Sequence, residues 1–447
     1  MPSSVPSTPP GTPPSVRRPL LAGAAGNFVE WFDFGVYGFQ ATVIATAFFP
    51  GHDPTAGLLA TFGIFAVAFF MRPVGAIVLG RLGDRVGRRA TLSLVVLMMS
   101  GSTALVGVLP THASVGTLAP VLLLVLRLVQ GFSAGGEYSG ASAFVVEYAP
   151  RERRGLYASV LSISTNAASL CGLGLAALLT QALGDTAMQS WGWRIPFLLA
   201  LPLGLVGLYL RLRVDDTPEF LALRRDAEVE SAPLKATWHG QRRAIGVVFG
   251  VVTFNAVAFY VLGSYWPTYL TSVVGLPRTT ALWSSAATYL VLIALVPVFG
   301  HLSDRYGRRP LMTYAACGLT LLAVPAFLLS SVGGFWPAFA GQLLFVSVAG
   351  ATGPVVTVLL VEMFPTRVRY TASSIGYNLS YLVFGGTAPY VATFLISRTG
   401  SNLSPAVYIT VIALVSLLVI RFCLPETAPR AVKPAAETAD SGAVTTA

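Results

Sequence analysis

Charged side chains are scarce in this chain. Asp, Glu, Lys and Arg make up 11% of its 447 residues, whereas about a quarter of a typical soluble domain is charged. Hydrophobic residues account for 54%, and they gather in runs of about 20 residues or more, the length that crosses a bilayer as a helix. The composition excludes a water-soluble globular protein and predicts a polytopic membrane protein.

Cysteine and histidine are also rare, which removes several kinds of chemistry. The three cysteines, Cys171, Cys317 and Cys423, have no paired spacing, so neither a disulfide framework nor a cysteine metal site is expected. The four histidines fall in predicted loops or at predicted helix ends, and no phosphate-binding loop of the GxxxxGK[ST] type occurs. We therefore expect no enzyme activity, no metal and no organic cofactor.

The net charge of +10 indicates either nucleic-acid binding or membrane orientation. Basic residues alternate here with hydrophobic runs, which is typical of orientation, so we expect no nucleic-acid partner. Nearly all Lys and Arg fall on the side of the predicted spans that holds the amino terminus; the exceptions are Arg194, Arg278 and Arg398. Because cytoplasmic segments carry the positive charge, both termini are predicted to be cytoplasmic.

The chain contains an internal repeat. The sequence GRLGDRVGRR at 80–89 returns as GHLSDRYGRR at 300–309, an offset of 300 − 80 = 220 residues. A second pair, EYAPRERR at 147–154 and EMFPTRVR at 362–369, follows in the same order at an offset of 362 − 147 = 215. Two motifs that share nearly the same period indicate two copies of one structural unit.

The hydrophobic runs and the repeat together predict the architecture. We expect an all-α membrane protein with twelve transmembrane helices in two six-helix bundles. The predicted parts are a disordered cytoplasmic tail (1–19), the first bundle (20–212), a cytoplasmic linker (213–243), the second bundle (244–424) and a second disordered cytoplasmic tail (425–447).

Five ionisable residues fall well inside the predicted spans, and all five belong to the first half: Glu30, Asp33, Arg72, Arg127 and Glu137. At 1.5 Å per residue from the start of the first span, Glu30 and Asp33 lie about 15–20 Å into the bilayer. A charge at that depth costs several kcal/mol unless it is paired or faces an aqueous cavity, and it therefore indicates a functional site.

These charges fit proton coupling, because a buried carboxylate and arginine whose spacing differs between two conformations can bind and release a proton. The alternative is that they are fixed ion pairs that lock helices together. Arg72 has a further alternative, since its long stem could reach the nearby cytoplasmic face. The candidate cavity residues of the first half, which share helix faces with these charges, are Asn27, Glu30, Trp31, Asp33, Tyr37, Arg72, Arg127, Gln130 and Glu137.

The predicted spans of the second half contain no acid or base, but they carry polar and aromatic side chains. Opposite Arg127, such a wall suits a small zwitterion, with its carboxylate on the arginine and its ammonium on aromatic faces. It suits a dicarboxylate or shikimate equally, and many of the aromatic residues could instead be packing or interfacial residues. The candidates are Asn255, Tyr260, Tyr265, Trp266, Asn378 and Tyr381.

The repeated basic turns are predicted to form a cytoplasmic gate. Their glycines permit a tight reversal, their aspartates can lie at a helix amino terminus, and their arginines can meet acids of neighbouring helices. The alternative is a topology signal with surface arginines. The gate candidates are Gly80, Asp84, Arg85, Gly87 and Arg88, their copies Gly300, Asp304, Arg305, Gly307 and Arg308, and Glu147, Arg154, Glu362, Arg369 and Glu426.

These motifs resemble those of the major facilitator superfamily, and within it the metabolite:proton symporter family. The similarity lies in the repeated turn, in GNFVEWFDFGVYGF at 26–39, in RLVQGFSAGGEYSGASAFVVEYAPRERRG at 127–155 and in WGWRIPF at 191–197. Among members, the proline/betaine transporters look most similar, through FFPGHDPT at 48–55 and YWPTYL at 265–270.

The resemblance implies alternating access around one central cavity, with proton entry drawing a small solute into the cell. It implies a monomer among the lipids of the inner (plasma) membrane, a small-molecule substrate and the proton as coupling ion. Symport of an organic acid such as 2-oxoglutarate, citrate or shikimate, and export of a drug or metabolite, remain alternatives.

Overall fold

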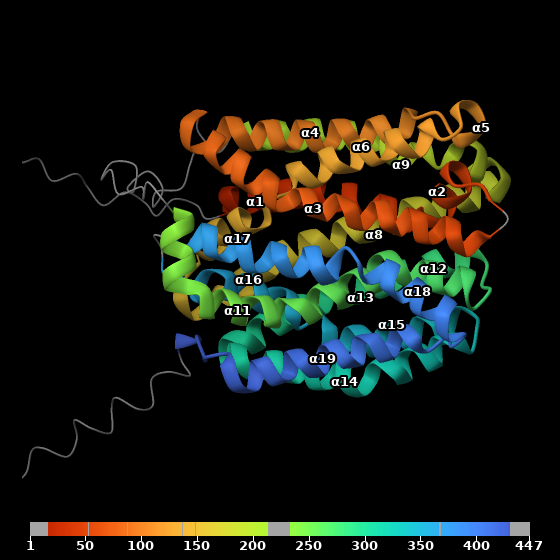
Figure 1. The fold of residues 1–447 in the computed structure, drawn as a ribbon. Helices are drawn as coiled ribbons and strands as arrows, with labels where there is room; N and C mark the ends of the chain where they lie inside the picture. The colour runs from red at the N-terminus through yellow and green to blue at the C-terminus, as the bar shows by residue number, and fades with distance from the viewer. Residues whose placement is uncertain are drawn as a thin grey trace, which may run out of the picture.

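The structure is a computed structural model that describes residues 17–51, 53–86, 88–135, 137–147, 149–212, 233–365 and 368–429. Helices make up almost all of these ranges, and no strand occurs within them. The helices run side by side along one common direction (Figure 1). The described chain is therefore a bundle of long, nearly aligned helices.

Within its described residues, the first half of the chain supplies six helical rods, several of which are interrupted. They are α1 (Arg17–Phe39) continued by α2 (Ala41–Phe48), α3 (Pro54–Val86), α4 (Arg88–Val108), α6 (Leu118–Ser133) with α7 (Glu137–Glu147), α8 (Arg154–Ala187) and α9 (Arg194–Leu212). A short helix, α5 (His112–Val115), precedes α6.

The second half supplies six more rods within its described residues. They are α11 (Pro233–Tyr260) with α12 (Trp266–Ser272), α13 (Arg278–Tyr306), α14 (Arg308–Ser331), α15 (Phe335–Ala349) with α16 (Thr352–Glu362), α17 (Arg369–Ser380) with α18 (Ala388–Thr399), and α19 (Ser404–Cys423). Short π-helical turns, Val261–Tyr265 and Tyr381–Gly385, join α11 to α12 and α17 to α18. Such turns are frequent at functional positions in helices.

Most of the rods have the length and composition of membrane spans. Eight of the described helical segments are long and apolar enough to cross a bilayer, and three shorter apolar helices lie in α4, α6 and α9. The rod outside both groups is α1, which carries Glu30 and Asp33. The described rod that does not meet the length and composition expected of a membrane span is thus the one that brings acids to the interior.

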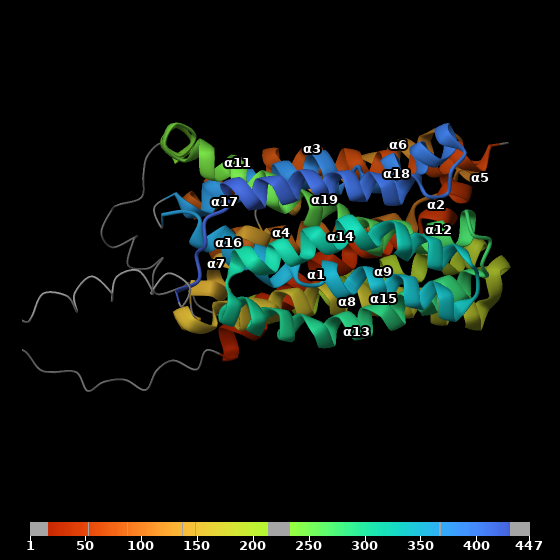
Figure 2. The ribbon, with the colours of Figure 1, turned by 90° about the horizontal axis from the view of Figure 1, so that it is seen from below.

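The bundle has two distinguishable ends. The beginning of α1 and residues 425–429 lie at one end, called here the terminal end, whereas α2, α5 and α12 lie at the opposite, far end (Figures 1 and 2). The two halves of the chain meet along the bundle, where α8 packs against α13 and α16, and α1 packs against the π-helical turn Val261–Tyr265. Any site between the halves is lined by these helices.

The predicted boundaries differ from the observed ones in three places. Helix α1 already begins at Arg17, inside the predicted tail 1–19, of which residues 1–16 lie outside the described residues. Residues 233–243 of the predicted linker belong to α11, and 213–232 are not described. Residues 425–429, predicted to be disordered, contact the bundle through Glu426, whose capping role composition cannot reveal.

Glycines allow α3 and α6 to approach at backbone contact. A Cβ atom added at Gly131 would overlap the carbonyl oxygen of Ala68, and one added at Gly75 would overlap the carbonyl oxygen of Phe132. A Cβ at Gly135 would meet the carbonyl oxygen of Arg72. Small residues at such positions are typical of closely packed membrane helices. The contact fixes α3, which carries Arg72, against α6, which carries Arg127.

We expect Gly75→Ala to destabilise the protein, because the added methyl group forces α3 away from α6 at a cost of about 1–3 kcal/mol. Gly63 lies on the same helix with no atom within 4 Å of the position a Cβ would take. Gly63→Ala should therefore leave the melting temperature unchanged or raise it, since alanine favours helix more than glycine does. Thermal unfolding of both purified variants in detergent measures the difference, and equal melting temperatures would contradict the packing argument.

Candidate functional site

Four of the five predicted intramembrane charges face the interior of the bundle. Glu30, Asp33, Arg72 and Arg127 are each no more than 2% exposed. Nη2 of Arg72 lies 3.8 Å from Oε1 of Glu30, so Arg72 is paired in the interior and does not extend to the terminal end. The side chain of the fifth charge, Glu137, lies outside the described residues. The first half thus holds a compact ionic group drawn from α1, α3 and α6.

Arg127 is held by a polar chain and by aromatic rings. Its Nη1 donates a 2.6 Å hydrogen bond to Oε1 of Gln130, and Nε2 of Gln130 donates to Oγ1 of Thr103 at 2.6 Å. Its guanidinium carbon lies 4.2 Å from the centroid of the Tyr37 ring. Nε and Nη2 of Arg127 have no hydrogen-bond acceptor among the described residues. The arginine is positioned with donors left for an anion.

Phe34 links the two arginines, and the sequence reasoning missed it. Its ring centroid lies 4.7 Å from the guanidinium carbon of Arg72 and 5.2 Å from that of Arg127. Both distances fall in the range of cation–π attraction. Phe34 follows Glu30 by one helical turn, so the i, i+4 spacing was a signal that could have placed it on the same face.

Asn27 orients Trp31 from within the first half. Its side-chain nitrogen donates to the carbonyl oxygen of Leu161 at 3.2 Å and to Oγ1 of Thr165 at 2.9 Å, both on α8. Its side-chain oxygen accepts a 3.1 Å hydrogen bond from Nε1 of Trp31. Both polar ends of Asn27 are therefore engaged, and its effect on a cavity is exerted through the indole.

Aromatic rings from both halves surround Trp31. Its ring centroid lies 4.8 Å from that of Phe259, 6.1 Å from Tyr138 and 6.3 Å from Tyr260 and Tyr381. Tyr138 of the first half and Tyr377 of the second stack at 4.8 Å. We call this group the aromatic cluster: Trp31, Tyr138, Phe259, Tyr260, Tyr377 and Tyr381. Its members Tyr138, Phe259 and Tyr377 were not predicted.

A small cavity, called here the central pocket, opens between the halves beside this cluster. The first half lines it with Trp31, Phe34, Gly35, Phe39 and Ser169, and the second half with Phe259, Tyr260, Gly263 and Ser264. No charged residue is among these described lining residues. Because Phe34 also contacts Arg127, a single ring separates this uncharged space from the guanidinium.

The remaining second-half candidates divide into two groups. Asn255 donates to the hydroxyl oxygen of Tyr381 at 3.2 Å, and Asn378 donates to the carbonyl oxygen of Gly135 in the first half at 2.8 Å, so both lie near the aromatic cluster. Trp266 instead packs against Phe327 and Phe345 inside the second half, and Tyr265 packs against Tyr269 and against Phe62 of the first half. The structure does not bring Tyr265 or Trp266 to the charged residues.

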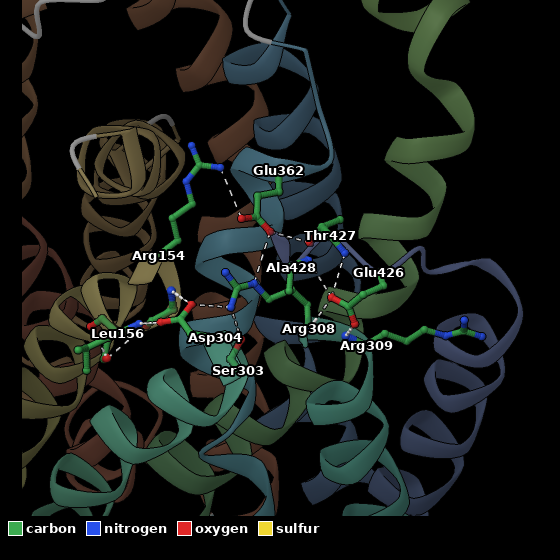
Figure 3. A network of polar contacts seen from close by, with 12 residues as sticks. Arg154, Leu156, Ser303, Asp304, Arg308, Arg309, Glu362, Glu426, Thr427 and Ala428 are labelled. Atoms are coloured by element: carbon green, nitrogen blue, oxygen red, sulfur yellow. Dashed lines mark hydrogen bonds and ion pairs between the residues drawn. The ribbon is translucent and has the colours of Figure 1, made fainter. Parts of the chain in front are cut away.

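At the terminal end, a carboxylate of the second half caps a helix of the first. Asp304 accepts hydrogen bonds from the backbone N–H groups of Gly155 at 2.7 Å and Leu156 at 2.9 Å, at the start of α8 (Figure 3). An acid at a helix amino terminus satisfies free N–H groups and complements the helix dipole. Arg308 also donates to Oδ1 of Asp304, at 2.8 Å, and reaches Glu362 at 3.4 Å.

Further ion pairs cross between the halves at this end. Arg154 of the first half lies 3.5 Å from Glu362 of the second, and Glu147 of the first lies 2.7 Å from Arg369 of the second. Glu426 accepts hydrogen bonds from the backbone N–H groups at the start of α14, at 2.8 and 3.1 Å. We call the whole set the terminal network: Glu147, Arg154, Asp304, Arg308, Glu362, Arg369 and Glu426.

The other gate candidates have different places. Arg305 is exposed and lies over the ring of Tyr306, outside the terminal network. Gly307 turns the chain from α13 into α14 with φ of +108°, a conformation that favours glycine. A Cβ at Gly300 would lie 2.5 Å from the carbonyl oxygen of Gly155, so α13 and α8 touch there. In the first copy of the repeated turn, Gly87 lies outside the described residues. The structure also does not describe the surroundings of Gly80 or the side chains of Asp84, Arg85 and Arg88.

The far end is closed by different chemistry, which the sequence did not reveal. Arg278 of the second half donates to Oε1 of Gln40, and Trp283 donates to Oε1 of Gln181 at 3.2 Å. Both acceptors are neutral amides of the first half. A Cβ at Gly38 would lie 2.6 Å from Cβ of Ser264, so the halves also meet sterically here. The described structure is closed at both ends around the central pocket.

We expect single methyl groups to open the two ends in opposite directions. Gly38→Ala should force the far end apart and Gly300→Ala the terminal end, each by about 1–3 kcal/mol, which corresponds to a 5- to 150-fold shift in population. Distances between spin labels attached across each end measure the shift. Gly101→Ala is the control, because no atom lies within 4 Å of its added methyl group; identical distance changes in all three variants would contradict the assignment.

Comparison with known proteins agrees with this geometry. Residues 20–243 match the family described as "Sugar (and other) transporter", and residues 248–446 match "Major Facilitator Superfamily". The chain is 37% identical over 431 residues to the "Proline/betaine transporter" of Escherichia coli (strain K12), covering 94% of this chain and 85% of that protein. It is 38% identical to the "Ectoine/proline transporter ProP" of Corynebacterium glutamicum, covering 88% and 81%.

Solved structures share the fold at low sequence identity. The proton:xylose symporter XylE bound to 6-bromo-6-deoxy-D-glucose superposes with a TM-score of 0.74 at 18% identity, covering 92% of this chain and 96% of that one. An inward open form of the same transporter gives 0.70 at 17% identity, covering 93% and 98%. The predicted twelve-helix fold and the predicted resemblance are confirmed. The chain belongs to the major facilitator superfamily of multi-pass membrane transporters.

Proposed function

We propose that the protein is a proton-coupled symporter that imports a small zwitterion such as proline or glycine betaine by alternating access. The observation that carries the proposal is Arg127, a fully buried cation with two nitrogens free to donate, one ring away from an uncharged aromatic pocket between the halves. The names of the relatives, which include proline, betaine and ectoine transporters, support the same solute class.

The two ends of a zwitterion match the two parts of the site. A carboxylate accepts charge-assisted hydrogen bonds from Nε and Nη2 of Arg127. The central pocket holds only about 10 Å³ in this closed structure. Once the halves move apart, the ammonium group lies there against ring faces, where cation–π attraction replaces lost hydration. The second arginine, Arg72, is already paired with Glu30. One available guanidinium favours a monocarboxylate over the dicarboxylates that the sequence left open.

Glu30 is the proposed proton carrier. It lies against Arg72 of the same half, and Arg72 in turn contacts Phe34, which borders both Arg127 and the central pocket. A shift of Phe34 on solute binding therefore changes the distance between Arg72 and Glu30. A carboxylate that loses its cation in a buried site binds a proton more readily, which links solute entry to proton entry.

Alternating access follows from the two closed ends. We place the terminal end in the cytoplasm of a cell whose inner membrane holds the protein, in agreement with the distribution of Lys and Arg. The terminal network then seals the cytoplasmic side while the far end opens to the outside. Release requires the reverse, with the ion pairs of the terminal network broken and the contacts of Gln40 and Gln181 formed. The pairs Arg154–Glu362 and Glu147–Arg369 at one end, and the contacts of Gln40 and Gln181 at the other, join the two halves, as a rocking movement demands.

We expect Arg127→Ala to abolish uptake of glycine betaine while the protein remains folded in the membrane, because the carboxylate loses its only proposed cation. The measurement is uptake of radiolabelled betaine into proteoliposomes, with the melting temperature as a control for folding. Arg127→Lys should restore part of the binding, since it returns a charge without the paired donors of guanidinium. Normal uptake by the alanine variant would remove the proposed solute site.

We expect Glu30→Gln to separate exchange from accumulation. The variant cannot cycle its proton, so an imposed inward proton gradient should no longer drive betaine above its external concentration. Exchange of internal for external betaine needs no net proton movement and should continue. Proteoliposomes with and without a proton ionophore measure both activities. Gradient-driven accumulation by Glu30→Gln equal to that of the unaltered protein would show that the proton is carried elsewhere.

A further inference from the structure

The far end holds a buried amide that is only half satisfied. Gln40 directly follows α1 and is fully buried. Its Oε1 accepts a hydrogen bond from Arg278 of the second half, but its Nε2 has no acceptor among the described residues. Because a buried donor without a partner is costly, this position calls for an acceptor that the described side chains do not supply.

Arg278 is the arginine that crosses between the halves at this end. Of the three arginines that the sequence places on this side, Arg194 donates to backbone carbonyl oxygens of the first half, and Arg398 lies over a phenylalanine of its own helix. Arg278 instead donates to Gln40 of the opposite half. A guanidinium carries five N–H donors, more than one amide oxygen can accept. Arg278 and Gln40 together therefore present a positively charged set of donors.

The acids at this end are exposed to solvent. Asp53 lies between α2 and α3, and Asp185 lies near the end of α8. Oδ1 of Asp53 accepts the backbone N–H of Thr55 at 2.9 Å. Water and salt weaken the interaction of such exposed charges with Arg278. Among the described residues, the hydrogen-bond acceptor of Arg278 is accordingly the amide of Gln40 and not an acid.

These donors lie close to the proposed solute site. Gln40 and Tyr37 are three residues apart, so they are neighbours on one side of the helix, about 4.5 Å apart along its axis. The ring of Tyr37 lies 4.2 Å from the guanidinium carbon of Arg127. Phe39, which precedes Gln40, lines the central pocket. A group bound between Gln40 and Arg278 is therefore about one helical turn from the level of Arg127.

We propose that Gln40 and Arg278 form an outer carboxylate site, which binds the carboxylate of an incoming solute before Arg127 does. When the far end opens, the two side chains separate, and one carboxylate can accept from the guanidinium with one oxygen and from Nε2 of Gln40 with the other. The carboxylate then passes to Arg127, and the direct contact between Gln40 and Arg278 forms behind it. The inference rests on the proposed function, because it takes the solute to enter from the far end.

Uptake kinetics separate this site from a simple latch. If Arg278 only closed the far end, its loss would favour the open form and lower the KM for external betaine. Loss of an outer carboxylate site raises KM instead. We expect at least a fivefold rise in the KM of betaine uptake into proteoliposomes for Arg278→Gln, with partial recovery in Arg278→Lys. An unchanged or lower KM for Arg278→Gln would overturn the proposal.

Trp283→Phe is the matched comparison. It removes the other hydrogen bond between the halves at this end, from Trp283 to Gln181, without removing a charge. Its KM should stay the same or fall, because a latch is lost and no carboxylate site is. An equal rise in KM for Trp283→Phe and Arg278→Gln would assign both residues to closure alone. Melting temperatures of both variants control for folding.

Acetate tests the site without relying on the transported solute. It carries a carboxylate and no ammonium group, and Arg127→Ala removes the inner cation, so the outer site is observed by itself. Saturation-transfer NMR should show acetate bound to the purified Arg127→Ala protein. The signal should fall at least threefold when Arg278→Gln is added, and likewise when Gln40→Leu is added, which provides a second variant if the first does not fold.

The outcomes distinguish this inference from the proposed function. Equal acetate signals with and without the second substitution would overturn the outer site, whatever the unaltered protein transports. An acetate signal that depends on Arg278 and Gln40, in a protein that takes up neither betaine nor proline, would support the outer site and overturn the proposed function.

Discussion

Ionic side chains are buried at the centre of this helical bundle, and the surrounding structure must stabilise their charges. Each of Glu30, Asp33, Arg72 and Arg127 would cost several kcal/mol if left alone in an apolar interior. The chain meets that cost with an ion pair, with the Gln130–Thr103 chain and with aromatic faces on both guanidinium groups. The close approach of α3 and α6, made possible by glycines, keeps the two arginines within reach of one phenylalanine.

The two ends of the bundle are closed by different kinds of contact. At the terminal end, carboxylates meet arginines and backbone N–H groups, and several of the contacts are charge-assisted on both partners. At the far end, the acceptors are glutamine amides and the remaining contact is steric. Charged pairs of good geometry are roughly twice as strong as neutral hydrogen bonds. The far end has one charged donor, Arg278, whereas the terminal end has several pairs in which both partners are charged.

The sequence revealed the parts of the site whose chemistry is rare, and it missed those whose chemistry is common. Five charges in hydrophobic runs are conspicuous, so Glu30 and Arg127 could be placed in the interior from their positions in the chain alone, whereas Arg72 could also have reached the cytoplasmic face. Phe34 shares a helix face with Glu30, but neither it nor Phe259 is conspicuous by residue type, because this chain has 26 phenylalanines. Whether they line the site depends on which helices meet between the two halves, and an internal repeat of 220 residues does not predict those contacts.

The same distinction holds for the gates. The repeated motif predicted that Asp304 would lie at a helix amino terminus and that Arg308 would meet an acid. It did not predict that the helix would be α8 of the opposite half, because that contact forms only in the tertiary structure. Gln40 and Arg278 carry no motif, and their meeting could not be foreseen. Residues 425–429 were predicted to be disordered from their composition, although the carboxylate of Glu426 and the hydroxyl of Thr427 join them to the bundle.

That carboxylate has a consequence for how the protein is made. Glu426 accepts the backbone N–H groups at the start of α14, more than one hundred positions earlier in the chain. A ribosome releases this acceptor only after every membrane helix has been threaded into the bilayer. Until then the first N–H groups of α14 lack this acceptor, so the contact between residues 425–429 and α14 is completed only when synthesis reaches its end.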